Sequence, residues 1–168
     1  LDFEYDVKDF LYFKIDRKKK IFSSTLLLAL GYTKSEIVDE FYENEQYTFD
    51  PKTEKWKTKF NPENYKAKNF SEEVIDAKTG NVVIKLGDKI NFLSAKKLAN
   101  DGLKDILVSR ESLFGKFLHR DVKLNDEEDN VFKIGSEIND TIIQQILDAN
   151  IHTLQISVTN SINKGPYL

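Results

Sequence analysis

The chain contains an internal repeat, in which residues 74–109 align without a gap on residues 122–157, at a spacing of 48 residues. The clearest match joins residues 83–91 to residues 131–139, which agree position by position in chemical character. One such stretch is too short to bury a core by itself, so the two copies are expected to pack together. The repeat therefore predicts a pseudo-twofold, β-rich module with one short helix in each half.

Each copy carries the turn and cap residues that such a half-module needs. A strand is predicted to end at a glycine, and an asparagine four residues later to cap a short helix. A second glycine or asparagine then ends the helix in the left-handed conformation, and a second strand closes the unit. These residues are Gly87, Asn91 and Gly102 in the first copy, and Gly135, Asn139 and Asn150 in the second.

Two β-hairpins are predicted ahead of the repeat. Aromatic and apolar residues alternate in residues 3–5 and 10–15, on either side of a polar stretch, as the two strands of a hairpin require. A second hairpin is expected from residues 47–49 and 56–60, with its turn at residues 50–53.

Two short helices are predicted between these hairpins. Ser23 or Ser24 can cap a Leu-rich helix, and Gly31 supplies the left-handed residue that ends it. Thr33 and Glu36 form a capping box that starts the next helix. The pair could form a helix–turn–helix that reads DNA, but Leu-rich packing helices are far commoner. The predicted fold class is therefore α+β: an N-terminal β-hairpin and two helices, then the pseudo-twofold repeat module.

Composition excludes several classes of function. With no cysteine in 168 residues, disulfides, thiolate zinc sites and cysteine nucleophiles are excluded. The net charge of -3 argues against a surface built throughout to coat nucleic acid, so any such contact must be local. The longest apolar run, residues 25–30, is far shorter than the ~20 residues that cross a bilayer. A cytoplasmic protein without a membrane partner is expected.

The polar residues offer little for catalysis or metal binding. His119 lies beside both charge signs, and a hydrolase would use it with Asp121, but no nucleophile is paired with it, and a surface or loop histidine is expected. His152 is expected to be a half-exposed strand residue. The acidic run at 126–129 lacks the spacing of a calcium loop and is predicted to be a solvated turn. Neither a catalytic nor a metal site is therefore assigned.

One cluster of cations has a plausible role. Arg17, Lys18, Lys19 and Lys20 lie between the end of a predicted strand and the first helix. A loop beside a rigid hairpin can reach outward, so these cations could hold nucleic-acid phosphate. A solvated loop or a contact with a partner protein remains the alternative.

The same part of the chain resembles a known family. Residues 1–6 read LDFEYD, residues 15–20 read IDRKKK and residues 28–33 read LALGYT. In this order they are similar to the L-D-F-E-F-D, R-I-D-R-R-R-K and R-A-L-G-Y-T patterns in the lobe of the β subunit of bacterial DNA-directed RNA polymerase. Residues 165–167, Gly-Pro-Tyr, also resemble the point where that family's chain leaves a lineage-variable insertion and resumes the lobe.

The resemblance implies a division into part of the lobe (residues 1–44), an insertion domain (45–164) and a return to the lobe (165–168). It implies a non-catalytic segment of a nucleotidyltransferase, whose partners are the β′, α and ω subunits, sigma factor and DNA, in the cytoplasm at the nucleoid. The catalytic magnesium of this family is held by β′, so no cofactor is expected in this segment.

The resemblance also implies which residues contact DNA. Asp16 and Arg17 match lobe residues near the non-template strand, and Lys18, Lys19 and Lys20 replace a mostly arginine run. Lysine keeps the attraction for phosphate as a point charge, but it loses the planar, bidentate contacts of arginine.

The insertion has two competing explanations. Because it is absent from some members of the family, it is expected to provide a docking surface for regulatory proteins or to extend the lobe. The alternative from another class is a stand-alone, pseudo-symmetric module that binds a small ligand or peptide between the two repeats.

Overall fold

The computed structural model describes residues 2–8, 10–16, 18–65, 68–69, 73–127 and 129–159, with only the backbone for 68–69. The chain forms two compact units. We call residues 1–44 with 157–168 the N-terminal unit, and residues 45–156 the repeat unit. The α+β fold class is confirmed, because helices and antiparallel strands are both present. The expected return to the lobe at 165–168 lies outside the described residues.

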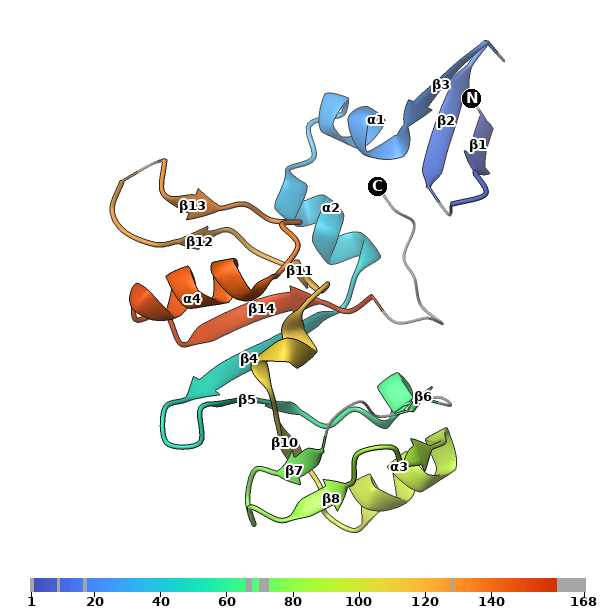
Figure 1. Cartoon of the computed structure of the whole chain (residues 1–168). Helices are drawn as coiled ribbons and strands as arrows, with labels where there is room; N and C mark the ends of the chain where they lie inside the picture. Colours follow the sequence, from blue (N-terminus) through green and yellow to red (C-terminus); the bar gives the residue numbers. More distant parts are fainter. Residues whose placement is uncertain are drawn as a thin grey trace. The chain divides into compact units, whose positions relative to one another are not determined.

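The N-terminal unit is built on a three-stranded antiparallel sheet in the order β1-β2-β3 (Figure 1). Its strands are β1 (Asp2–Tyr5), β2 (Leu11–Ile15) and β3 (Lys19–Phe22). The predicted first hairpin is confirmed as β1 and β2. The third strand is a correction, because Lys19 and Lys20 were expected in a loop. They pair with Ile15 and Lys14 of β2, so the strand is specified by its neighbour more than by its own composition.

Two helices follow, α1 (Ser23–Ala29) and α2 (Lys34–Phe41). The predicted serine cap of α1 is wrong: Phe22 is the N-cap residue and gives no side-chain cap. The end of α1 is as predicted, because Gly31 has a φ of 96° and Tyr32 N–H donates to Leu27 at 3.1 Å, as in a Schellman motif.

The predicted capping box of α2 is confirmed. Thr33 Oγ1 accepts from Glu36 N–H at 3.2 Å, and the Glu36 carboxylate accepts from Thr33 N–H at 2.7 Å. The hydrogen bonds that the Glu36 carboxylate accepts from the Thr33 backbone N–H and hydroxyl lower the pKa of Glu36. Ile37 of α2 is buried.

The repeat unit is centred on a hairpin of β4 (Asn44–Asp50) and β5 (Lys55–Lys59), as predicted. Asp50 fixes the turn, since its carboxylate accepts from Lys52 N–H at 3.0 Å and from the Thr53 hydroxyl at 2.9 Å. The hairpin lies inside a seven-stranded sheet in the order β11-β14-β4-β5-β10-β7-β8. The other strands of this sheet are β7 (Val74–Asp76), β8 (Val82–Ile84), β10 (Asp105–Val108), β11 (Phe117–Leu118) and β14 (Thr153–Ser157).

The sequence repeat is also a repeat of structure. Helices α3 (Phe92–Asn100) and α4 (Asp140–Asp148) begin and end 48 residues apart. The same shift relates two short 3-10 helices, η1 (Pro62–Tyr65) and η2 (Arg110–Leu113). It also relates the pairing of Asn69 with Lys89 to the bridge between Phe117 and Glu137. The structural repeat therefore begins earlier than the sequence predicted, with copies at residues 62–109 and 110–157 in tandem.

The turns and caps predicted for the two copies are confirmed. Gly87 and Gly135, the glycines of the first turn in each copy, both have a φ of 82°. Gly102 and Asn150, which follow the helices, also have positive φ values, 105° and 57°. Asn91 caps α3 by accepting from Ser94 N–H at 2.9 Å. Asn139 caps α4 in the same way, by accepting from Ile142 N–H at 3.0 Å.

The two copies differ in how their hairpins are used. In the first copy, β7 and β8 extend the large sheet beside β10. In the second, β12 (Val122–Lys123) and β13 (Val131–Phe132) form a separate two-stranded sheet, and β11 is the neighbour of β14. In the first copy, β6 (Lys68–Asn69) pairs instead with β9 (Lys89–Ile90).

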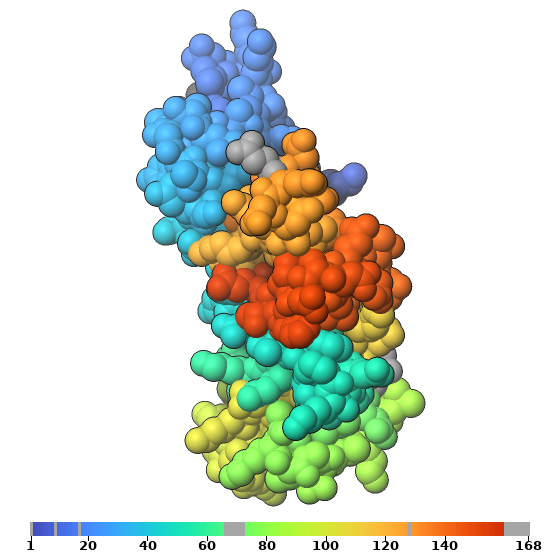
Figure 2. Space-filling model, turned by 90° about the vertical axis from the view of Figure 1, so that its left-hand side faces the viewer, coloured from blue at the N-terminus to red at the C-terminus, as the bar shows by residue number. Residues whose placement is uncertain are grey.

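One hydrophobic core serves both copies. Ala95 of α3 and Ile143 of α4 occupy equivalent positions, and both are 0% exposed. Trp56 of the central strand β5 is also 0% exposed and belongs to the same cluster. In the space-filling view the second copy (orange to red), the central hairpin (teal) and the first copy (green) follow one another (Figure 2). This order matches the order of strands in the sheet, so the copies lie on either side of the hairpin.

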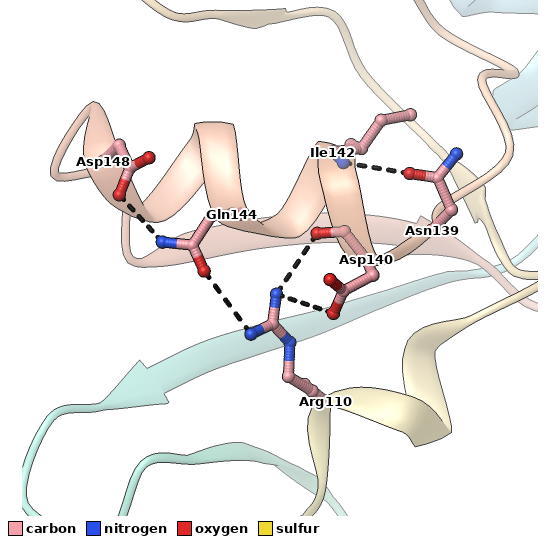
Figure 3. A network of polar contacts seen from close by, with 6 residues as sticks. All are labelled: Arg110, Asn139, Asp140, Ile142, Gln144 and Asp148. Atoms are coloured by element: carbon pink, nitrogen blue, oxygen red, sulfur yellow. Dashed lines mark hydrogen bonds and ion pairs between the residues drawn. The ribbon is translucent and has the colours of Figure 1, made fainter.

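A polar network attaches α4 to η2 in the second copy (Figure 3). The Arg110 guanidinium lies 3.0 Å from the Asp140 carboxylate, and it also donates to the Asp140 carbonyl at 3.2 Å. It reaches the Gln144 side chain at 3.5 Å, and Gln144 donates to Asp148 at 2.8 Å. The first copy has Pro62 in place of the arginine, so this network belongs to the second copy alone.

Candidate nucleic-acid interface

The turn between β2 and β3 presents the residues that the sequence assigned to DNA contact. Ile15 pairs with Lys19, and Lys18 N–H donates to the Ile15 carbonyl at 3.3 Å, which closes the turn. Asp16 has a φ of 53°, a left-handed conformation that aspartate tolerates better than most residues. Arg17 lies outside the described residues. The turn is held by backbone bonds, so Asp16 and Lys18 stay at its tip.

Lys20 is committed to contacts within the sheet. Its ammonium lies 3.0 Å from the Glu4 carboxylate, which also binds Lys14 at 2.7 Å. It lies 4.4 Å from the centre of the Tyr12 ring, a cation–π contact. Hydrogen bonds from Lys14 and Lys20 lower the pKa of Glu4, and the bond to Glu4 raises the pKa of Lys20. The pair therefore stays ionised around neutral pH, and Lys20 is the least available of the three lysines in the run.

Lys18 and Lys19 are exposed, and within the described part of the chain they make no ion pair. Successive strand residues point to opposite faces, so Lys19 lies on the other face of the sheet from Lys20. The structure therefore does not gather the lysine run into one patch. Lys20 lies beside Lys14 on the neighbouring strand. Lys18 lies in the turn, and Lys19 lies at the start of β3.

An aromatic cluster shares the face of Lys20, and the sequence analysis did not identify it as a site. The Tyr12 and Phe22 rings are stacked at 4.6 Å, and Phe10 lies 5.7 Å from Phe22 in an edge-on arrangement. In the sequence Phe10 and Tyr12 served only to predict a strand, and Phe22 was assigned to none. Phe22 could not be placed beside Tyr12 without the pairing of β3 with β2.

A second row of lysines was also missed. Lys55, Lys57 and Lys59 alternate with buried residues along β5, so all three lie on one face of that strand. Lys57 lies 3.7 Å from the carboxylate of Asp105 on β10. The K-x-K-x-K spacing of this row is visible in the sequence. The neighbouring carboxylate compensates part of its charge.

The structure corrects the expectation for His119. This residue is 1% exposed and is therefore not a surface histidine, although it lies in a bend after β11, as a loop histidine would. Its backbone N–H donates to the Gln155 carbonyl of β14 at 2.9 Å, which holds it against the large sheet. Asp121 is engaged elsewhere: its carboxylate accepts from Ile134 N–H at 2.8 Å and lies 3.3 Å from the Lys133 ammonium. His152 was expected to be a half-exposed strand residue. It is exposed and immediately precedes β14, so it lies outside the strand.

The acidic run occupies the turn between β12 and β13, as predicted, with Glu128 outside the described residues. Glu127 N–H donates to the side chain of Asn125 at 3.0 Å, and Asn130 N–H donates to the Glu127 carbonyl at 3.2 Å. Throughout the described ranges, no three side chains of His, Cys, Asp or Glu are grouped so that they could hold a metal ion. None of the helices in those ranges is long and apolar enough to span a membrane.

Comparison with known proteins gives one consistent result. The chain is 38% identical over all 168 residues to the DNA-directed RNA polymerase subunit beta of Rickettsia felis, and equally to that of Rickettsia prowazekii. It is 37% identical to that of Rickettsia canadensis, again over 168 residues. No family model matches the chain. The chain spans 12% of the length of each of these relatives. By this similarity along its whole length, the chain is a relative of one segment of the β subunit of bacterial DNA-directed RNA polymerase.

Proposed function

We propose that the chain acts in DNA-templated RNA synthesis as a segment of the polymerase β subunit. The observation that carries this proposal is the 38% identity over the whole chain, which includes the repeat as well as the N-terminal motifs. Residues 1–44 then form part of the lobe, one wall of the cleft around downstream DNA, and residues 45–164 form an insertion. The partners are β′, α, ω, sigma factor and DNA, in the cytoplasm at the nucleoid. This similarity favours the polymerase segment over the stand-alone binding module.

The segment itself is catalytically silent under this proposal. The reaction is nucleotide transfer with magnesium held by the β′ subunit. The buried His119 and the engaged Asp121 leave the hydrolase alternative without support. The lobe residues of this chain then act by binding and positioning DNA.

The DNA contact is assigned to the turn between β2 and β3. Asp16 and Lys18 are exposed in that turn, and Lys19 is exposed at the start of β3. Arg17 belongs to this assignment by its place in the sequence. Lys18 and Lys19 supply point charges for phosphate, which position the strand without reading its sequence. Lys20 has a different role, because its bonds to Glu4 and Tyr12 hold β3 in place.

Replacing Lys18 and Lys19 together by alanine in the intact polymerase tests this contact. Each lost phosphate contact is expected to reduce the slope of log binding constant against log salt concentration by about 0.7–0.9. The measurement is the affinity for forked DNA at several salt concentrations. Lys78→Ala, in the turn between β7 and β8, is the matched control and should leave the slope unchanged. An identical slope in the double variant and the parent enzyme would contradict the proposed phosphate contact.

The insertion is assigned to docking of regulatory proteins or to extension of the lobe. The repeat unit, residues 45–156, makes up most of this insertion. Its ends suit removal, because Val158 N–H donates to the Glu43 carbonyl at 2.9 Å just outside it, so the chain returns beside the point where it left. Replacing residues 45–156 by a short Gly-Ser linker in the intact polymerase is expected to preserve basal nucleotide addition on a primed scaffold. Abolition of that activity in a correctly assembled complex would contradict the docking role.

A further inference from the structure

We draw no further inference here: the strongest candidate, the apolar surface patch of Phe3 and Tyr5 on the side of the three-stranded sheet where Phe13 is buried, is an exposed apolar face, and nothing in the structure shows what covers it.

Discussion

Replacing Trp56 by alanine is expected to lower the free energy of unfolding of the repeat unit by about 3–5 kcal/mol. Trp56 is 0% exposed in β5 and lies opposite Phe49 of β4 and Val108 of β10. Its ring is 5.3 Å from that of Phe49, and both belong to the core region shared by the two copies. The substitution leaves a cavity at the centre of the large sheet, where neighbouring strands limit any collapse.

Urea unfolding followed by far-UV circular dichroism measures this change, since the substitution removes the one tryptophan of the chain. Leu93→Ala is the control, because Leu93 is 74% exposed and should cost little. Trp56→Phe should fall between the two: within the described residues the indole N–H has no hydrogen-bond partner, so its removal loses no bond. Equal midpoints for Trp56→Ala and Leu93→Ala would contradict the central place of Trp56.

Replacing Phe13 by alanine is expected to destabilise the N-terminal unit by about 3–5 kcal/mol. Phe13 is 3% exposed in the middle strand of three, and it pairs with Phe3 on one side and Ile21 on the other. Small cores depend on few large side chains, so one deletion removes a larger share of the total than it would in the repeat unit.

Hydrogen exchange resolved by residue gives the measurement for Phe13→Ala, because it reports each unit separately. Amides of β1, β2 and β3 should lose protection, whereas those of β5 and β10 should keep it. Val7→Ala is the control, since Val7 is 99% exposed in the turn between β1 and β2. Uniform loss of protection in both units would show that the units do not unfold independently.

The elements best predicted from sequence are those specified by local chemistry. The asparagine caps at 91 and 139, the capping box at Thr33 and the left-handed end at Gly31 each depend on residues a few positions apart. The repeat was visible where side chains match. It was not visible at residues 62–65 and 110–113. There Pro62 and Arg110 occupy equivalent positions in the two copies, but their side chains are chemically unlike.

The elements that were missed depend on distant partners. Strand β3 was not predicted because a run of lysines is typical of a loop, and only its pairing with β2 makes it a strand. His119 was expected at the surface or in a loop, yet it is buried, and its backbone N–H bonds to Gln155, which is 36 residues farther along the chain. Long-range pairing of this kind has no local signal.

The candidate site shows the same limit. Adjacent lysines suggest a single basic patch, but strand geometry sends Lys19 and Lys20 to opposite faces, and Glu4 of another strand binds Lys20. The aromatic cluster was hidden for a related reason: Tyr12 and Phe22 become neighbours only through the register of β2 and β3. Residue types could thus be listed from the sequence, but their grouping could not.

The position of β14 has a consequence for the order of synthesis. β14 (Thr153–Ser157) is the neighbour of β4 (Asn44–Asp50), although about a hundred residues separate them. On a ribosome the first copy can assemble on the central hairpin through β10, while the outer edge of β4 stays open until the second copy has emerged. An open edge is where a strand from another chain can add, so the nascent chain is most vulnerable to mispairing in that interval. The last strand of the repeat unit to be synthesised is therefore the one that protects the first strand of that unit.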